Sequence, residues 1–300
     1  MFVIKHKAIF FTITAGLMLA SLIFAFIWPP SLSIEFTGGS VVEGHYASTT
    51  PAIETLNTRV SEILPGSRVT PVGDTGLVVR TKDLSSDEHN KLIVALSPEA
   101  SQQFVETDLS TVGPSIGSEL RSKALLSVIL VLALIILFVA FSFRSASRVV
   151  SSWKFGLSVI ICLVHDIFVP VGIFAVIAHF IPGYEIDTLF VTAILAILGY
   201  SVADTIVVFD RIRENLKHSS GKEPFEDVVG RSLRETYARS INTSLTTVLA
   251  ALAILFFGGE ATRHFALMLA IGIAVGTYSS ILLASPLLVY ISGKSKTGQK

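Results

Sequence analysis

Residues 186 to 215 read IDTLFVTAILAILGYSVADTIVVFDRIREN, and the rest of the chain can be interpreted outward from this stretch. It begins as an apolar run long enough to cross a bilayer, and it ends in a cluster of charged residues. Asp204 lies inside the apolar run, where a carboxylate costs roughly 2.5 to 3.5 kcal/mol on insertion scales. A helix that begins near Thr188 places Asp204 about 24 Å along its axis, towards the far side of a bilayer core roughly 30 Å thick. We therefore take Asp204 as the leading candidate for a functional residue.

The composition is that of a membrane protein. Of the 300 residues, 51% are hydrophobic and 15% are charged, whereas a soluble protein carries about 25% charged residues. The net charge of zero argues against nucleic acid as the main partner. The single cysteine, Cys162, cannot form a disulfide within the chain. The sequence has no His/Cys cluster that would suggest a metal site, and we expect no cofactor. The first apolar run lacks a cleavage site after it and is interpreted as a retained span.

The apolar blocks predict a polytopic α-helical membrane protein with three parts. Residues 1–28 form a cytoplasmic N-terminus and first span, 29–122 a polar domain, and 123–300 the remaining spans. The expected six spans are 8–28, 124–143, 156–180, the run from Thr188 through Asp204, 241–257 and 265–291. In the last span, Gly272 and Gly276 suit close helix packing, and Ser285-Pro286 predicts a kink.

The polar domain at 29–122 predicts a ferredoxin-like α/β fold with the order β-α-β-β-α-β. The expected elements are a strand at 33–46 broken at Gly38-Gly39, a helix at 51–64, a hairpin of strands at 67–73 and 75–81, a helix at 85–96 capped by Ser86, and a strand at 101–112. About ninety residues suffice for one small core of two helices on one sheet.

Basic residues predict the orientation, because cytoplasmic loops carry an excess of Lys and Arg. They gather on one side of the predicted membrane: Lys5, Lys7, Arg144, Arg148, Lys154, Arg211, Arg213, Lys217, Lys222, Arg231, Arg234, Arg239, Lys294, Lys296 and Lys300. On the other side, loop 179–187 has no Lys or Arg, and loop 258–264 has only Arg263. We therefore expect cytoplasmic termini and a domain that faces the periplasm or cell exterior. Within the charged cytoplasmic segment 210–239, residues 223–238 predict an amphipathic helix on the membrane surface.

Polar residues inside two consecutive spans indicate a proton relay. Tyr200 and Asp204 share one helix face, and Ser240, Thr243, Ser244 and Thr247 form a hydroxyl stripe on the next span. Arg239 stands at the start of that stripe, at a depth similar to that of Asp204. A buried carboxylate near an arginine can alternate between paired and protonated states. The alternative is that the hydroxyls bond their own helix carbonyls and the charged pair is only structural.

His165 and Asp166 form a second intramembrane polar pair, near mid-membrane in the third span. They are either an interhelical hydrogen-bond pair or a second functional site. Two intramembrane aspartates also suggest an aspartyl protease, but Ser201-Val202-Ala203 precedes Asp204 where such enzymes have Gly-x-Gly. The chain has no nucleotide-binding P-loop either. We therefore expect a protein that is not an enzyme.

Four motifs resemble the SecF family, the smaller members of the SecD/SecF pair of bacterial protein export. They are GGS at 38–40, VGPSIGSEL at 112–120, LGYSVADTIVVFDRIREN at 198–215 and ARSINTSLTT at 238–247. The resemblance covers nearly the whole chain, and it implies a relative of the resistance-nodulation-division transporters with six spans and a periplasmic domain after the first. Its periplasmic motif corresponds here to Gly38, Gly39, Gly113, Pro114 and Gly117.

The resemblance also implies a function in the bacterial inner membrane, in contact with membrane lipid. The implied partners are SecD, the SecYEG channel, YajC and the preprotein, and the implied activity is late-stage export driven by the proton-motive force. Asp204 matches the proton-pathway residue and Arg239 its partner, and Tyr200, Thr243 and Thr247 complete the expected pathway. Two positions depart from the family pattern: Ala203 stands where Asn is frequent, and Glu35 where Asp is frequent.

Two other functions remain open at this point. A small-molecule exporter of the same superfamily would have twelve spans and two large periplasmic insertions, whereas this chain predicts six spans and one modest domain. A passive structural subunit would use Asp204 only to hold helices together.

Overall fold

The computed structural model describes residues 2–47, 50–98, 103–143, 150–181, 183–219 and 223–293. These residues divide into two compact units. The helical unit comprises 1–29, 127–176 and 189–300, and the α/β unit comprises 30–126 and 177–188. Loop 177–188 thus belongs with the α/β unit, although the predicted boundaries 29–122 did not include it. Six of the basic residues that predicted the orientation lie outside the described residues: Arg144, Arg148, Lys222, Lys294, Lys296 and Lys300.

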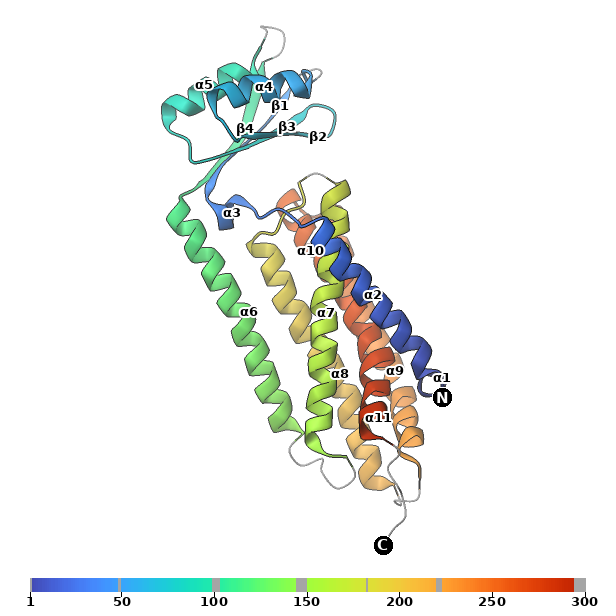
Figure 1. Ribbon diagram of the computed structural model, residues 1–300. Coiled ribbons are helices and arrows are strands. Elements are labelled where there is room, and N and C mark those ends of the chain that lie inside the picture. Colours follow the sequence, from blue (N-terminus) through green and yellow to red (C-terminus); the bar gives the residue numbers. More distant parts are fainter. Residues whose placement is uncertain are drawn as a thin grey trace. The chain divides into compact units, whose positions relative to one another are not determined.

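Six helices in the described part of the chain are long and apolar enough to cross a membrane, which confirms the six predicted spans (Figure 1). A short helix, α1 (Phe2–Lys5), precedes them. The spans are α2 (Lys7–Ile27), α6 (Pro114–Ser142), α7 (Ser152–Phe180), α8 (Thr188–His218), α9 (Phe225–Phe257) and a composite sixth span of α10 (Glu260–Ser279), the π-helical segment η1 (Ser280–Ala284) and α11 (Ser285–Ser292).

Two of these helices extend further than the sequence indicated. Helix α6 begins at Pro114, ten residues before the predicted span, because proline is well suited to the first turn of a helix. Helix α9 is continuous from Phe225 to Phe257, so the amphipathic segment and the fifth span are one helix and not two. No proline interrupts that run, and the change from polar to apolar residues near Ile241 therefore leaves the helix unbroken.

Small residues bring the spans close together in the helical unit. A Cβ atom at Gly172 of α7 would lie 2.4 Å from the Ser21 Cα of α2. A Cβ atom at Gly276 of α10 would lie 3.1 Å from the Ser201 Cβ of α8, and one at Gly272 would overlap the side chain of Ile197. The close packing that the spacing of Gly272 and Gly276 predicted is therefore present, and α8 is the helix that it brings near.

The α/β unit contains a four-stranded antiparallel sheet. Its elements after the short helix α3 (Ile34–Thr37) are β1 (Gly39–Tyr46), α4 (Ile53–Ile63), β2 (Arg68–Val72), β3 (Gly76–Thr81), α5 (Ser86–Leu96) and β4 (Phe104–Val112), in the predicted β-α-β-β-α-β order. The strands lie in the order β2-β3-β1-β4, with every neighbouring pair antiparallel. Two local predictions were wrong: residues 34–37 form a helical turn and not a strand, and the cap of α5 is Ser85, which forms a capping box with Glu88.

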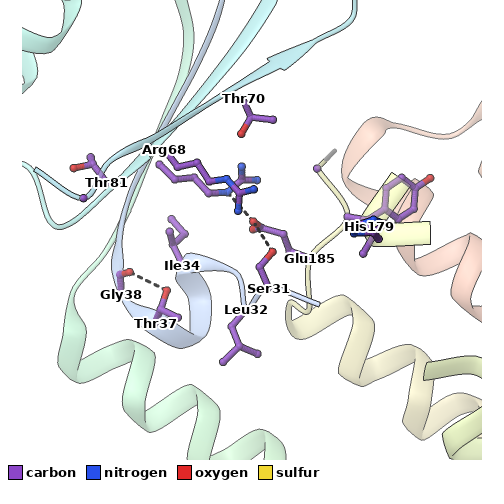
Figure 2. A pocket seen from close by; sticks show the side chains of 15 residues that line it. Ser31, Leu32, Ile34, Thr37, Gly38, Arg68, Thr70, Thr81, His179 and Glu185 are labelled. Atoms are coloured by element: carbon purple, nitrogen blue, oxygen red, sulfur yellow. Dashed lines mark hydrogen bonds and ion pairs between the residues drawn. The ribbon is translucent and has the colours of Figure 1, made fainter. Parts of the chain in front are cut away.

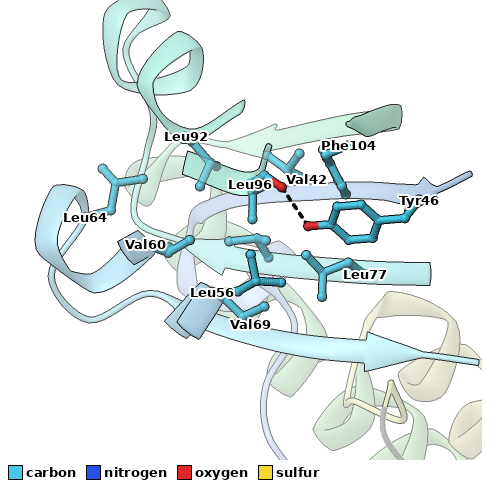
Figure 3. Packing of buried hydrophobic residues seen from close by; sticks show 11 residues of the cluster. Val42, Tyr46, Leu56, Val60, Leu64, Val69, Leu77, Leu92, Leu96 and Phe104 are labelled. Atoms are coloured by element: carbon cyan, nitrogen blue, oxygen red, sulfur yellow. Dashed lines mark hydrogen bonds between the residues drawn. The ribbon is translucent and has the colours of Figure 1, made fainter. Parts of the chain in front are cut away.

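Helices α4 and α5 cover one face of the sheet and enclose its hydrophobic core (Figure 3). The core includes Leu56 and Val60 from α4, Leu92 and Leu96 from α5, and strand residues such as Val42. Tyr46 is its largest polar member, and its hydroxyl donates a 2.8 Å hydrogen bond to the carbonyl of Leu96. Burial raises the pKa of Tyr46 to about 12.

Replacing Tyr46 by phenylalanine tests this bond. We expect Tyr46→Phe to lower the free energy of unfolding of the α/β unit by about 1–2 kcal/mol, because the Leu96 carbonyl loses its donor. The neutral phenol is favoured in the folded state, so its contribution is complete below pH 10 and is lost as the pH rises towards about 12. Denaturant unfolding at pH 7 measures the first effect. The second effect is measured by titrating phenolate absorbance in the wild-type protein and in Tyr46→Phe, since the difference between the two curves is the titration of Tyr46. A difference curve with its midpoint near pH 10, instead of near 12, would contradict the prediction.

Two residues of β2, Val69 and Pro71, leave the outer edge of this strand without a free amide for pairing with a further strand. The amide of Val69 donates to the side-chain oxygen of Asn57 at 3.3 Å. Pro71, two residues further and therefore on the same side of the strand, has no amide hydrogen.

Candidate functional site

Asp166 of α7 lies at the centre of a hydrogen-bond network in the helical unit. Its side chain is fully buried, and it accepts hydrogen bonds from Ser201 of α8, from Ser279 of α10 at 2.8 Å, and from the Nδ1 atom of His165 at 2.8 Å. The interhelical hydrogen bonds that were one interpretation of the His165-Asp166 pair are therefore present. A buried carboxylate is tolerated when its oxygens are satisfied in this way, and here it ties three helices together.

The network continues from His165 to the sixth span. The Nε2 atom of His165 lies 2.7 Å from the hydroxyl of Tyr278, and the two rings meet edge to face. Both nitrogens of this buried imidazole thus have partners, which holds the ring in one orientation.

Asp204 lies one turn beyond Ser201 on α8 and has a different environment. Its carboxylate accepts a hydrogen bond from Ser280, and the residue is only half-buried. The two aspartates therefore contact consecutive serines, Ser279 and Ser280, at the junction of α10 and η1. Asp166 is enclosed by donors, whereas Asp204 is partly accessible and is the better placed of the two to exchange a proton.

The contact between Asp204 and Ser280 occurs where the sixth span changes from α to π geometry. Segment η1 (Ser280–Ala284) is π-helical and is followed by Pro286 in the first turn of α11. Proline cannot donate to the carbonyl four residues before it and clashes with it in an α-helix, which accounts for the wider turn. A π-helical segment thus directly precedes Ser285-Pro286, where the sequence predicted a kink, and such segments are frequent at functional sites.

The predicted hydroxyl stripe on α9 divides into two sets. Ser240 and Ser244 are buried, and Ser244 accepts hydrogen bonds from Tyr200 at 3.3 Å and from Thr277 at 2.6 Å. Thr247 instead donates to the carbonyl of Thr243 in its own helix at 3.0 Å, as the alternative interpretation proposed. Tyr200 therefore joins α8 to α9 and α10, whereas Thr243 and Thr247 lie outside this network.

Arg239 is not placed beside Asp204. Among the described residues there is no ion pair between them, and Arg239 is exposed at a hollow of about 490 Å³ that Asp210, Glu214 and Glu235 also line. Two of the carboxylates in this hollow already bind Arg211, at 2.6 Å each. The pairing implied by the family resemblance is therefore absent from this conformation.

The glycine motif joins the two ends of the α/β unit. A Cβ atom at Gly117 of α6 would lie 2.7 Å from the amide nitrogen of Gly38, and one at Gly38 would lie 2.8 Å from the Cα of Pro114. Gly39 has a φ of +119°, and a Cβ atom there would lie 2.4 Å from the carbonyl oxygen of Thr81. Gly113 has open space around it. Gly38, Pro114 and Gly117 of the predicted motif thus meet where the chain enters and leaves the domain.

The segment through which the chain enters the α/β unit, residues 31–38 (the entry segment), contacts the loop before α8. The Ser33 amide donates to the Ile186 carbonyl, and the Ile186 amide donates to the Ser31 carbonyl, both at 2.9 Å. The Glu35 carboxylate accepts from the backbone amide and the hydroxyl of Thr188, each at 2.7 Å. A cavity of about 370 Å³ lies beside these contacts, lined by Arg68, Arg80, His179, Glu185 and other residues of the unit (Figure 2).

Glu185 connects this loop to the sheet. Its carboxylate lies 2.9 Å from the Nε atom of Arg80 on β3 and accepts a hydrogen bond from Ser31 at 3.3 Å, as Figure 2 shows for Ser31. Burial raises the pKa of the Glu185 carboxyl above its ordinary value, and the positive charge of Arg80 offsets part of this rise.

The serines and the tyrosine that bind the two aspartates and His165 were not predicted from the sequence. These residues are Ser201, Tyr278, Ser279 and Ser280. The available signal was the polar run Tyr278-Ser279-Ser280 within an otherwise apolar span, six residues before the predicted kink at Pro286.

Known proteins resemble this chain in both sequence and fold. A family model described as protein export membrane protein SecD/SecF, C-terminal, matches residues 93–294. The protein translocase subunit SecF of Anaerolinea thermophila is 35% identical over 290 residues, which cover 96% of this chain and 92% of that protein. SecF of Sebaldella termitidis is 36% identical, with coverage of 99% and 93%.

A longer relative carries a similar region within a larger chain. SecDF of Thermus thermophilus is 35% identical over 94% of this chain and 37% of its own length. A crystal structure of SecDF, described as a translocon-associated membrane protein, has a TM-score of 0.78 at 34% identity and covers 95% of this chain and 38% of that one. Because the family model matches two thirds of the chain and relatives match along almost their whole lengths, this chain belongs to the SecF family of SecD/SecF protein export membrane proteins.

Proposed function

We propose that this chain is a non-enzymatic subunit of Sec-dependent protein export in the bacterial inner membrane. It acts with a SecD partner, in association with the SecYEG channel and YajC, on a preprotein that emerges at the periplasmic face. The α/β unit is periplasmic and both termini are cytoplasmic. The names of the relatives, protein translocase subunit SecF and SecDF, support a role in Sec-associated export. The fused SecDF chain supports SecD as the partner, because one polypeptide there joins both parts.

The observation that carries the coupling part of the proposal is the position of Asp204. Its carboxylate lies half-buried within a membrane-spanning helix, and it contacts the first residue of a π-turn on another span. Protonation removes its charge and weakens the bond to Ser280, so the local arrangement of α8 against η1 changes with proton occupancy. The proton-motive force can thereby bias two helix arrangements and move the periplasmic domain late in export.

Arg239 takes part in this cycle as the group that neutralises Asp204 when the helices change position. It lines the hollow at the cytoplasmic end of α8, exposed and without a bound carboxylate among the described residues. Tyr200 belongs to the same pathway through its bond to Ser244. Thr243 and Thr247, which lie on α9 outside that bond network, are included in the pathway because they match the family motif. His165 and Asp166 keep α8 and the sixth span attached to α7 while the contact between Asp204 and Ser280 changes.

The periplasmic domain is ferredoxin-like in this proposal. The element order β-α-β-β-α-β and the strand order β2-β3-β1-β4 support that assignment, because a split β-α-β pair places the first and third strands at the centre of the sheet.

The replacement Asp204→Asn tests the function. We expect it to abolish the part of preprotein export that the proton gradient stimulates, in vesicles that contain the SecD–SecF complex and the channel, because asparagine cannot exchange a proton. Membrane levels of this chain and of SecD are measured in parallel and are expected to stay normal. Unchanged export would contradict the proposal, and a lost complex would indicate a passive structural role for Asp204 instead.

A further inference from the structure

We propose that Glu35 is the positioning residue that transmits movement of the Asp204 helix to the α/β unit. This inference rests on the proposed function and names the residue through which a proton-driven change within the membrane reaches the domain.

The first observation is that Glu35 accepts two hydrogen bonds from the first residue of α8. Its Oε2 atom accepts from both the backbone amide and the hydroxyl of Thr188, at 2.7 Å each, and Thr188 is the first residue of the helix. The first amides of a helix have no partner within it and carry the positive end of its dipole. An ionised carboxylate bound there satisfies one such amide and is held more tightly than a neutral acceptor.

The second observation is that the neighbouring residues hold the same two segments together. The backbone bonds between Ser31, Ser33 and Ile186 form a short parallel bridge that spans Leu32 and Ile186. The entry segment and the residues before α8 are therefore joined at three successive points, and the contact made by Glu35 reaches the helix itself.

The third observation is that the other end of the entry segment cannot slide freely. Gly38 is in contact with α6, and Gly39 approaches the Thr81 carbonyl of β3 so closely that a side chain would not fit. Gly39 is also the first residue of β1, a central strand of the sheet. A displacement of Thr188 is therefore passed through Glu35 to the segment that leads directly into the sheet.

The fourth observation is that Thr188 and Asp204 belong to one continuous helix. They are about 24 Å apart along its axis, and the helix is unbroken between them. The position at which the proton acts and the position at which the domain is held thus lie on one helix.

Glu35→Ala is the variant that separates this role from a merely structural one. In vesicles containing the SecD–SecF complex and the channel, we expect it to leave complex levels and proton flux near normal while lowering gradient-stimulated export at least tenfold. Glu35→Asp keeps the carboxylate and is expected to restore most export. Thr188→Val retains the backbone amide and is expected to have an intermediate effect. Glu62→Ala, which removes an exposed glutamate on α4 of the same unit, is the matched control and is expected to change nothing.

Three results would overturn the inference. Export that is unaffected by Glu35→Ala would show that the contact between Glu35 and Thr188 does not transmit movement of α8 to the domain. Proton flux and export lost together would place Glu35 in the proton pathway, and reduced complex levels in both Glu35→Ala and Thr188→Val would assign it to assembly. Asp204→Asn is measured in the same vesicles: if it leaves export unchanged, the proposed function itself fails, whereas blocked export with a normal Glu35→Ala removes only the transmission role.

Discussion

Replacement of Asp166 by alanine is expected to lower the free energy of unfolding of the helical unit by about 3 kcal/mol. The change leaves the Nδ1 atom of His165 and the hydroxyl of Ser201 without their buried acceptor, and each such loss costs about 1–3 kcal/mol. Ser279 loses less, because its hydroxyl also bonds the carbonyl of Gly276 at 3.0 Å. The expected loss exceeds the roughly 0.6–2 kcal/mol of a single interhelical hydrogen bond in membranes, because one side chain joins three helices.

Unfolding of the purified protein in mixed micelles, followed by circular dichroism, measures this cost. Asp166→Asn keeps the shape and an acceptor oxygen, and we expect it to cost about 1 kcal/mol. Asp210→Ala is the matched control, because it removes an aspartate from α8 that is exposed and forms only a surface ion pair with Arg213. If Asp166→Ala were no more destabilising than Asp210→Ala, the network around Asp166 would not hold the helices together.

The second large effect is expected at Gly172, where α7 crosses α2. A Cβ atom there would lie 2.3 Å from the Cβ and 2.6 Å from the backbone oxygen of Ser21. Backbone atoms cannot move aside as a flexible side chain can, so Gly172→Ala must separate the two helices. We expect a loss of about 2–3 kcal/mol in the free energy of unfolding, as for other overpacked interiors.

Gly156, on the same helix, provides a control of opposite sign. A Cβ atom at this position would have no neighbouring atom within 4 Å, so Gly156→Ala introduces no clash and removes the entropic cost of glycine in a helix. We expect it to stabilise the protein by about 0.5–1 kcal/mol. The two variants are compared in one unfolding series. Equal effects would show that helix propensity, and not the close approach of Ser21, determines the result.

Patterns that act over a few residues predicted most of the fold. The apolar runs predicted the six spans, and the spacing of residues such as Leu56 and Val60 predicted the helices of the α/β unit. The ends of the helices and the short turns were less well predicted. Residues 34–37 form a helical turn because Ser33 caps the Glu35 amide, a local hydrogen bond that outweighs the strand-like composition.

The partners of the candidate site depend on contacts that a single sequence does not reveal. Counting residues along each helix predicted that Asp204 and Arg239 would have similar depths. Helices α8 and α9 are in contact, but Arg239 is exposed at the hollow, because depth alone does not determine which side chains meet. Gly272 and Gly276 let α10 approach α8, and this packing brings Ser279 and Ser280 to the aspartates. The hydrogen bonds of Asp166 were predictable in kind, because a buried carboxylate requires donors, but their sources on α8 and α10 were not.

The closed edge of β2 has a consequence for how this domain can pair with other polypeptide chains. An extended polypeptide joins a sheet by using the unpaired amides of an edge strand, which is also how folded domains begin to aggregate. Val69 offers its amide to Asn57 and Pro71 has none to offer, so β2 cannot recruit such a chain. Strand addition is therefore confined to β4, the other edge of the sheet, and the domain can lengthen in one direction only.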